Sequence, residues 1–160
     1  MSRPLRILLV NKAYPPHIGG IETLVRQYAR YFQTQFSAEV QVLVCQEKGK
    51  TAQETIEGVP VLRAGSIGTY FSCPLSGSFL RYFRKYAKQA DVVMIHMPFP
   101  LADLACLLSG YRGRVVLAWH SDVIKQKTLL RFYAPLLRWL LRRADCILTA
   151  TQGHIDSSAF

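Results

Sequence analysis

Hydrophobic residues gather in six short runs that are separated by longer segments of mixed polarity. The runs are residues 5–10, 38–45, 59–64, 91–96, 114–119 and 145–150. Several of them, such as LRILLV and RVVLAW, are apolar at almost every position, as strands buried on both faces of a sheet are. Strands that alternate with segments of helical length predict an α/β domain, with a Rossmann-like parallel sheet flanked by helices on both faces.

Helical periodicity is clear in three of the intervening segments. From Ile21 to Phe32, apolar residues recur every three or four positions opposite charged ones, which predicts a helix that packs on the sheet. Segments 78–90 and 127–143 show the same period, although Pro135 should kink or split the second. Segment 64–76 has no clear period and is predicted to be an irregular surface loop, and the last ten residues resemble the opening of another helix.

The length of 160 residues, half of them hydrophobic, fits one domain over residues 1–160. No signal peptide is indicated and no apolar run of about 18 uncharged residues occurs, so we expect the chain to be cytoplasmic. Its four cysteines form no C-x-x-C pair, which argues against a zinc site or a disulfide framework.

A loop rich in proline and glycine, residues 11–20, joins the first strand to the first helix. Gly19 and Gly20 lack a Cβ atom, so a phosphate or sugar could approach the backbone at a helix start, where anions are attracted. The alternative is that the glycines only form a tight turn. Glu22 lies in the first turn, where a carboxylate favours the helix dipole. No G-x-G-x-x-G fingerprint follows the strand, which argues against a nicotinamide-dependent oxidoreductase.

Histidines follow two of the predicted strands, and parallel strands bring such residues to one edge of the sheet. His120 directly follows the fifth strand and could donate a hydrogen bond to a sugar hydroxyl or phosphate, while Asp122 stands two residues later. Alternatively, both residues cap the next helix. His96 ends the fourth strand and is a secondary candidate, or an ordinary structural residue. Lys12 and His17, near the glycines, are candidates for acceptor or phosphate contacts. No serine-nucleophile motif supports acyl transfer.

The net charge of +10 is unevenly distributed, because 12 of the 20 basic residues lie between positions 76 and 143. Two predicted helices carry the excess on one side each, and this could be no more than a solvated face. Together, two such faces favour an anionic membrane surface or a phosphorylated lipid acceptor. Without a helix-turn-helix, RRM or KH signature, nucleic acid is not expected. The residues are Arg81, Arg84, Lys85 and Lys88 in the first helix, and Lys127, Arg131, Arg138 and Arg142 in the second.

Three stretches, YPPHIGGIE, HSD and RRADCILTATQGHIDSS, resemble the amino-terminal domain of glycosyltransferase family 4. The resemblance spans essentially the whole chain, and the combination is more specific than any one stretch. It implies one of the two Rossmann-like domains of a GT-B glycosyltransferase, which face each other across a cleft. It also implies transfer of a sugar from a nucleotide-sugar donor, with retention of anomeric configuration and generally without a metal ion or other cofactor.

The resemblance also implies roles for matched positions. Gly19 and Gly20 correspond to the family's glycine loop near the donor diphosphate and transferred sugar, and His120 to a histidine that contacts the donor sugar. The amino-terminal domain mostly binds the acceptor, and many relatives dock on the cytoplasmic face of a membrane. The carboxyl-terminal domain, with its donor-gripping glutamate pair spaced E-x7-E, is expected to be absent from this chain. The 160-residue piece alone is therefore expected to be inactive or nearly so.

These observations predict the acceptor-side half of a retaining glycosyltransferase, cytoplasmic and possibly peripheral on the inner face of the membrane. Its partners would be a nucleotide-sugar donor and a glycan or lipid-linked acceptor of a cell-surface polysaccharide. The runner-up is a non-catalytic Rossmann-like module that binds an anionic membrane surface or a partner protein through its basic helices.

Overall fold

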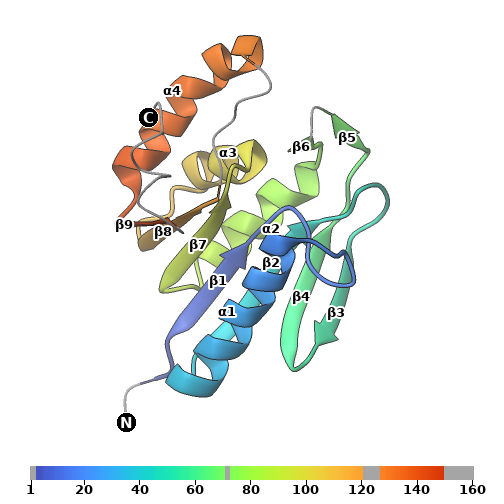
Figure 1. Cartoon of the computed structure of the whole chain (residues 1–160), viewed down its shortest axis with the longest axis vertical. Helices are drawn as coiled ribbons and strands as arrows, with labels where there is room; N and C mark the ends of the chain where they lie inside the picture. The colour runs from blue at the N-terminus through green and yellow to red at the C-terminus, as the bar shows by residue number, and fades with distance from the viewer. Residues whose placement is uncertain (1–2, 71–72, 121–126, 150–160) are drawn as a thin grey trace.

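The computed structural model describes residues 3–70, 73–120 and 127–149 of the chain. In this part, seven strands form one sheet in the order β3-β4-β2-β1-β7-β8-β9, and every neighbouring pair is parallel except β3 with β4 (Figure 1). The predicted α/β class is therefore confirmed. The strands are β1 (Arg6–Val10), β2 (Glu39–Cys45), β3 (Ala52–Ile56), β4 (Val59–Ala64), β7 (Val92–Met97), β8 (Arg114–Trp119) and β9 (Cys146–Thr149).

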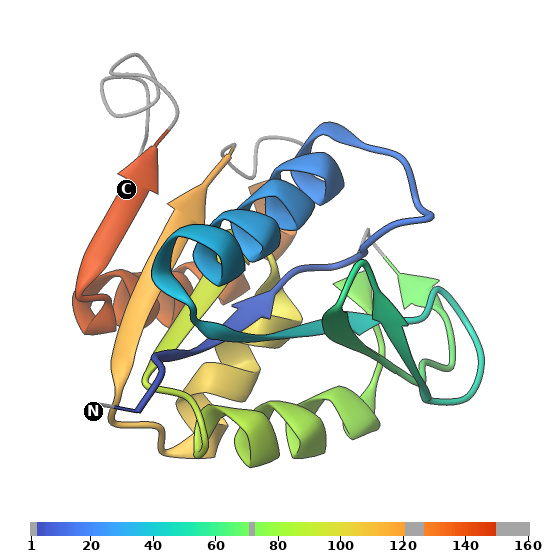
Figure 2. The same cartoon turned by 90° about the horizontal axis from the view of Figure 1, so that it is seen from below.

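Helices cover both faces of this sheet, as the apolar strand runs require. Figures 1 and 2 show α1 (Gly20–Phe36) on one face and α2 (Gly77–Ala87), α3 (Pro100–Ser109) and α4 (Lys127–Arg143) on the other. Successive strand residues point to opposite faces. In β1, accordingly, Leu8 and Val10 join the core under the three helices, whereas Ile7 and Leu9 join the core under α1.

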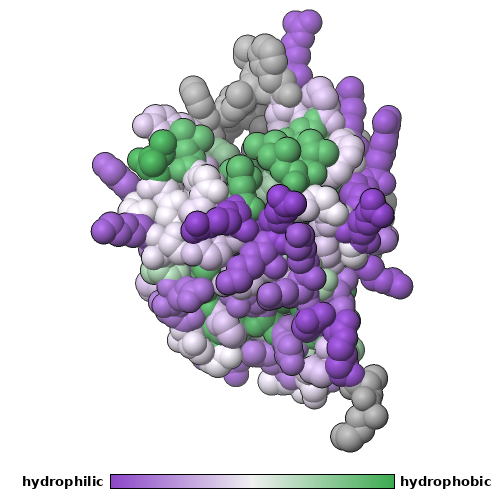
Figure 3. Space-filling view, turned by 180° about the vertical axis from the view of Figure 1, so that it is seen from behind, coloured by the Kyte–Doolittle hydropathy of each residue, from purple (hydrophilic) through white to green (hydrophobic). Residues whose placement is uncertain are grey.

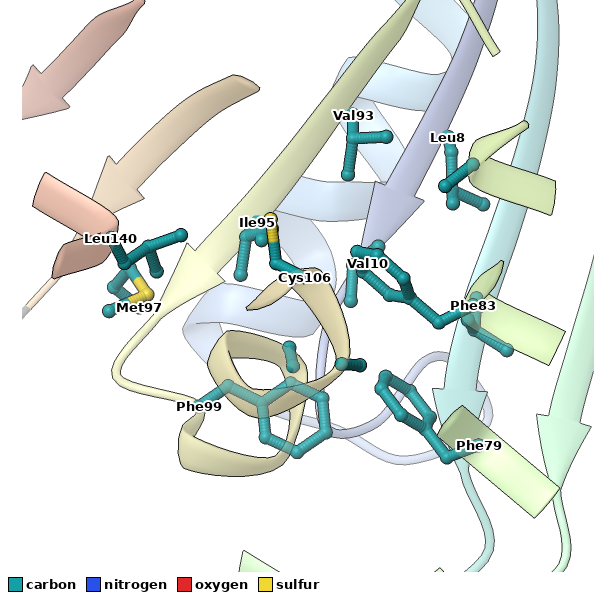
Figure 4. Close-up of a cluster of buried hydrophobic side chains, with 14 of the residues drawn as sticks. Leu8, Val10, Phe79, Phe83, Val93, Ile95, Met97, Phe99, Cys106 and Leu140 are labelled. Atoms are coloured by element: carbon teal, nitrogen blue, oxygen red, sulfur yellow. The ribbon is translucent and has the colours of Figure 1, made fainter. Parts of the chain in front are cut away.

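The larger core, under α2, α3 and α4, is built around aromatic side chains (Figure 4). Phe79 and Phe83 of α2 and Phe99 before α3 are fully buried, and the rings of Phe79 and Phe99 meet edge to face at 5.3 Å. Burying a side chain of this size contributes about 1.5–3 kcal/mol. The three helices are thus fixed to the sheet, and the strand ends that they flank keep a defined position.

The six predicted strands all occur, with ends within two residues of the predicted ones. Sequence periodicity did not single out α3, because PLADLACLLS is apolar nearly all round. It also missed β3, whose residues are mostly exposed at the sheet edge. The predicted irregular loop holds a small antiparallel ribbon of β5 (Thr69–Tyr70) and β6 (Cys73–Pro74). Pro135 lies inside α4, which runs through it as one helix.

The direction of strand winding reverses between β1 and β7. From β1 the sheet continues to β2 on one side, and from β7 to β8 and β9 on the other. Helices α1 and α3, which follow β1 and β7, pack on opposite faces. Ligands of such sheets bind outside the carboxyl ends of the strands at this reversal. The residues that follow β1 and β7 are therefore the place to look for a site.

Within the described residues, no helix combines the length and the apolar character that crossing a membrane would require. Two predictions fall on residues that the structure does not describe. These are Asp122 and the helix expected over the last ten residues.

Candidate functional site

The loop after β1 is held in place from within by Asn11 and Tyr14. The backbone N–H of Asn11 donates to the carbonyl of Leu43 at 3.2 Å, and its side-chain amide donates to the carbonyl of Ala13 at 2.9 Å. Tyr14 is almost completely buried. These contacts continue the line of β1 for a few residues before the chain turns outward to Pro16 and Ile18, which are exposed.

A guanidinium from another strand fixes the same loop from outside. Arg63 of β4 donates to the carbonyl of Tyr14 at 3.1 Å and also to the carbonyl of Pro15, and it pairs with Glu54. Its side chain is mostly buried. The proline-rich and glycine-rich sequence of the loop gave no sign of Arg63, which stands 49 positions from Tyr14.

The two glycines differ in what surrounds them. Among the described residues, a Cβ atom at Gly20 would meet nothing within 4 Å outside its own helix backbone, whereas one at Gly19 would lie 2.1 Å from Oε2 of Glu22. Gly19 caps α1 in an extended conformation, with φ −169°, which any residue can adopt. Neither glycine is required by a left-handed turn, and Gly20 is not required by packing. The backbone at Gly20 is therefore open to a ligand.

The carboxylate of Glu22 already covers part of the start of α1. It lies in the first turn, as the sequence predicted, with Oε1 3.8 Å from Nδ1 of His17. A carboxylate is favourable there because it faces the positive end of the helix dipole. An incoming phosphate would be attracted to the same place, so it must displace Glu22 from Gly19 or bind beside it.

His96 and His120 form a pair at the carboxyl ends of β7 and β8. His96 Nδ1 lies 2.9 Å from His120 Nε2, and the rings stack with centroids 5.2 Å apart and planes 7° apart. The strand register causes this, because His96 stands beside Ala118 and the N–H of His120 donates to the carbonyl of Met97. The sequence placed both histidines on one edge but did not predict that they pair.

Electrostatics keep His96 neutral. It is buried, and burial together with the neighbouring His120 lowers its pKa to about 3. A neutral His96 carries one ring proton, so the tautomer decides which ring donates in the hydrogen bond between His96 Nδ1 and His120 Nε2. Nε2 of His96 has no hydrogen-bond partner among the described residues, and its ring lies 6.0 Å from that of Tyr28.

The histidine pair shares a face of the sheet with α1. Met94 and Ala118 belong to the core under α1, and strand alternation places His96 and His120 on that same face. Tyr28, which meets His96, stands eight residues after Gly20, or about 12 Å along the helix. The pair therefore lies about two helical turns from the glycines, on the same side of the sheet.

An open groove of about 530 Å³ adjoins the glycine loop. Lys12, His17 and Glu22 line it, together with Lys48 from the loop after β2 and Thr69 of β5. Burial lowers the pKa of Lys12. Two predicted acceptor contacts, Lys12 and His17, therefore meet in one groove, while His96 and His120 are not among its lining residues.

A second groove, of about 480 Å³, opens beside Arg6 at the amino end of the strands, away from this edge.

Asp103 of α3 is a buried carboxyl group that the sequence did not mark. The hydroxyl of Tyr133 in α4 donates to its Oδ2, and Oδ1 has no hydrogen-bond partner among the described residues. Burial raises the pKa of Asp103 to about 7, although the Tyr133 hydrogen bond and the charge of Lys12 act in the opposite direction. The pair connects α3 to α4.

We expect Asp103 to make a contribution to stability that is lost as pH rises from about 4 to about 7, whereas His96, with its pKa lowered to about 3, contributes the opposite trend up to roughly pH 6.5. Over that range the folded protein holds a proton on Asp103 that the unfolded chain releases, so deprotonation penalises the fold. Asp103→Asn keeps an acceptor for Tyr133 and removes the penalty. Urea unfolding should show that the variant gains roughly 1–3 kcal/mol relative to wild type between pH 4.5 and pH 7.5.

Asp145 provides the matched control for this prediction. It is exposed, and the N–H of Val115 lowers the pKa of its carboxyl. Its contribution to stability changes only below about pH 4, so between pH 4.5 and pH 7.5 the difference between Asp145→Asn and wild type should stay constant. Parallel pH curves for wild type and Asp103→Asn would contradict the assignment of a raised pKa to Asp103.

The predicted basic side chains lie on the outer surfaces of α2 and α4. Three on α2 and Lys88, the residue that caps its C-terminal end, are exposed, as are three of the four on α4, and the side chain of Lys127 lies outside the described residues. Their exposure is confirmed, whereas their partner stays a prediction. The exposed residues are Arg81, Arg84, Lys85 and Lys88 on α2, and Arg131, Arg138 and Arg142 on α4.

The spacing E-x7-E does occur in the chain, contrary to what we expected, at Glu39 and Glu47. Strand β2 separates the two residues, since it begins at Glu39 and ends two positions before Glu47. Eight steps of extended chain place the two Cα atoms roughly 26 Å apart. Side chains so distant cannot hold one nucleotide together, so this match is a coincidence of spacing.

The described ranges, 3–70, 73–120 and 127–149, contain no group of side chains arranged like a metal site. There, no three histidine, cysteine or carboxylate side chains come together as metal ligands would. The expectation that the chemistry needs no metal ion stays a prediction.

Comparison with known sequences places these features in context. A family model described as Glycosyltransferase Family 4 matches residues 18–157. The chain is 30% identical over 155 residues to O-antigen chain mannosyltransferase C of Escherichia coli, and 31% identical over 155 residues to D-rhamnosyltransferase WbpZ of Pseudomonas aeruginosa. Both matches cover 96% of this chain, but 42% and 40% of the relatives, so it spans about two fifths of their length.

The fold is similar to parts of larger solved structures. Sucrose-phosphate synthase from Thermosynechococcus elongatus matches with a TM-score of 0.60 and 13% identity, covering 89% of this chain and 41% of that one. A trehalose-phosphate synthase from Burkholderia xenovorans, in complex with glucose-6-phosphate, matches with a TM-score of 0.56 and 13% identity, covering 95% and 42%. At such low identity the likeness concerns the fold alone.

Proposed function

Because this chain belongs to Glycosyltransferase Family 4, we propose that it forms the acceptor-side domain of an enzyme that transfers a sugar from a nucleotide-sugar donor. The acceptor is a glycan or lipid-linked glycan of a cell-surface polysaccharide. The relatives named as an O-antigen chain mannosyltransferase and a rhamnosyltransferase support this choice. In this proposal the sugar is of the hexose type, its anomeric configuration is retained, no metal ion is required, and the enzyme works on the cytoplasmic side of the membrane.

One observation carries the proposal: the winding reversal brings three features to the same edge of the sheet. The backbone at Gly20 is open, the groove beside it presents Lys12 and His17, and the pair of His96 and His120 ends the two neighbouring strands. A donor with a diphosphate and a sugar needs these two kinds of contact, backbone N–H groups for the anion and a polar side chain for the hydroxyls.

The proposed reaction exchanges two bonds at the sugar C1 atom. The bond from C1 to the diphosphate oxygen breaks, and the nucleoside diphosphate leaves with the electron pair. The acceptor hydroxyl oxygen bonds to C1, and its proton leaves with the diphosphate. The helix start at Gly19 and Gly20 stabilises the developing negative charge, and His120 orients the sugar by a hydrogen bond, so catalysis is electrostatic and positional.

The acceptor binds in the groove beside the glycine loop. Lys12 and His17 contact its phosphate or hydroxyl groups there, and Glu22 stands at the boundary between groove and helix start. The carboxylate of Glu22 is then the group that moves when a diphosphate arrives, because both anions are drawn to the same helix end.

We further propose that a second domain supplies most of the nucleotide contacts. The chain covers about two fifths of the relatives' length, and its E-x7-E spacing does not form a pair. Residues 1–160 produced alone are accordingly expected to release no measurable nucleotide from any sugar nucleotide. Turnover by that piece would contradict a two-domain site.

The test of the proposed function is nucleotide release by the full-length protein from a panel of sugar nucleotides. We expect release from one donor or a narrow group of donors, increased when a lipid-linked glycan acceptor is added. Residues 1–160 alone serve as the control. If no donor released its nucleotide, even with a free glycan and a lipid-linked glycan present as acceptors, a non-catalytic binding module would be favoured instead.

A further inference from the structure

The loop between β1 and α1, residues 11–19, receives few hydrogen bonds from the rest of the chain. Its first two residues are tied to the backbone of β2. Among the described residues, every hydrogen bond that reaches residues 13–19 from outside the loop and α1 comes from Arg63. One side chain therefore fixes the middle of the loop.

Helices α2, α3 and α4 do not add to this support. Their layer packs on the face of the sheet opposite α1. Figure 3 shows the outer side of the layer, where long hydrophilic side chains surround hydrophobic patches. In the described parts of the chain, none of the three helices makes a hydrogen bond with residues 11–19. The middle of the loop thus depends on β4 alone.

Arg63 is held firmly in the sheet, so it can serve as a fixed point. Its side chain is only 13% exposed. Nε donates to the carboxylate of Glu54 on β3, and the two Nη groups donate to the carbonyls of Tyr14, at 3.1 Å, and Pro15. All three guanidinium nitrogen atoms therefore have partners, and the planar group fixes the directions of these hydrogen bonds. Figure 1 shows the loop beside β4.

The held carbonyls stand directly before residues of the proposed site. Pro15 is two positions before His17 and four before Gly19. Arg63 is not among the residues that line the groove of Lys12 and His17, so it acts on a ligand there through the loop. A shift of the two carbonyls would move both the wall of the groove and the start of α1.

We propose that Arg63 is a positioning residue for substrate binding, which holds the loop in the conformation that places the groove of Lys12 and His17 beside the open backbone at Gly20. This inference rests on the proposed function, since it concerns the same donor and acceptor site. Pro15 is only half-buried, so water can solvate the freed carbonyls once the loop moves. Without the guanidinium the loop adopts several conformations, while the fold persists.

The expected effect is a rise in KM for both donor and acceptor. If about a tenth of the molecules hold the loop in the competent conformation, each apparent dissociation constant rises about tenfold, while the bound complex reacts at its usual rate. In nucleotide release by the full-length protein, Arg63→Ala should therefore raise both KM values about tenfold and change kcat less than about threefold. A role limited to general stability would lower the amount of active enzyme, and hence kcat, with KM unchanged.

Arg26 provides the matched control. It pairs with Glu57 at the turn between β3 and β4, but it lies on α1 and makes no hydrogen bond with residues 11–19 within the described chain. Arg26→Ala should keep both KM values within about twofold of wild type.

Two further measurements test the guanidinium itself. Added ethylguanidinium can fill the space left in Arg63→Ala, and it should lower the raised KM values about threefold or more in that variant but not in wild type. Arg63→Lys keeps the charge beside Glu54 and much of the side chain, so it provides a folded variant if Arg63→Ala does not fold. Lysine cannot match the fork that holds two carbonyls, and it should raise both KM values about threefold or more.

Amide hydrogen exchange separates failure of this inference from failure of the proposed function, because it requires no activity. Exchange over residues 13–19 should be about tenfold or more faster in Arg63→Ala than in wild type, and unchanged in Arg26→Ala. Wild-type exchange and KM in Arg63→Ala would overturn the inference, as would a lowered kcat with KM unchanged. If the full-length protein released no nucleotide while exchange were faster in Arg63→Ala alone, the proposed function would fail and the anchoring of the loop by Arg63 would stand.

Discussion

Replacing His120 with alanine in the full-length protein is expected to lower kcat/KM for the nucleotide-sugar donor by about a hundredfold to a thousandfold. In the proposed site His120 forms a hydrogen bond with a hydroxyl of the donor sugar, and alanine would leave the sugar unoriented at the reacting carbon. The fold should persist, because His120 is only partly buried at the end of β8. Steady-state nucleotide release and circular dichroism of the same preparations would measure both effects.

His96 provides the control that separates this role from a structural one. We infer that it is a positioning residue, since it contacts His120 at 2.9 Å and is itself buried. His96→Asn retains an oxygen near the position of Nδ1 that can accept a hydrogen bond, so it should keep most of kcat. His96→Leu cannot accept one and should lower kcat about tenfold or more, with a smaller change in KM. Equal losses in the two variants would indicate a packing role instead.

The architecture could be predicted because its signals are local. The apolar runs that became β1, β7 and β8 mark strands by composition alone, and the alternation with helices implies a parallel sheet. Helix α3 lacks a polar side, so it gives no helical period, and its exposed leucines could be recognised only once the neighbouring helices were in place. β3 owes its position to pairing with β4, which composition does not reveal.

The site was predictable only in outline, because topology predicts the edge of the sheet where its residues lie but not the side chains that they contact. His120 and the glycines follow strands, and topology sends such positions to one edge. Their partners come from distant parts of the sequence. His96 reaches His120 across 24 residues through strand register, and Arg63 reaches the loop carbonyls from β4. The position of Glu22 over Gly19 depends on a side-chain conformation, which no sequence pattern encodes.

Gly20→Ala is expected to leave the fold intact and to raise the donor KM about tenfold or more. Outside the helix's own backbone, a Cβ atom there meets no atom of the described residues within 4 Å, so neither packing against them nor backbone strain opposes the change. In the bound state, however, the proposed diphosphate or sugar occupies that space, and a methyl group would push it away from the backbone N–H groups. Thermal unfolding and donor titrations of wild type and variant would give the two quantities.

Gly19→Ala separates the two interpretations of this loop. Its Cβ atom would collide with the carboxylate of Glu22, the flexible end of a side chain, which can move away at little cost. Because the donor is proposed to displace that carboxylate anyway, Gly19→Ala should impair donor binding less than Gly20→Ala, provided that the diphosphate lies nearer Gly20. If both variants bound donor like wild type, the glycines would have no role in approach of the ligand, and the anion site would have to be sought elsewhere on this edge.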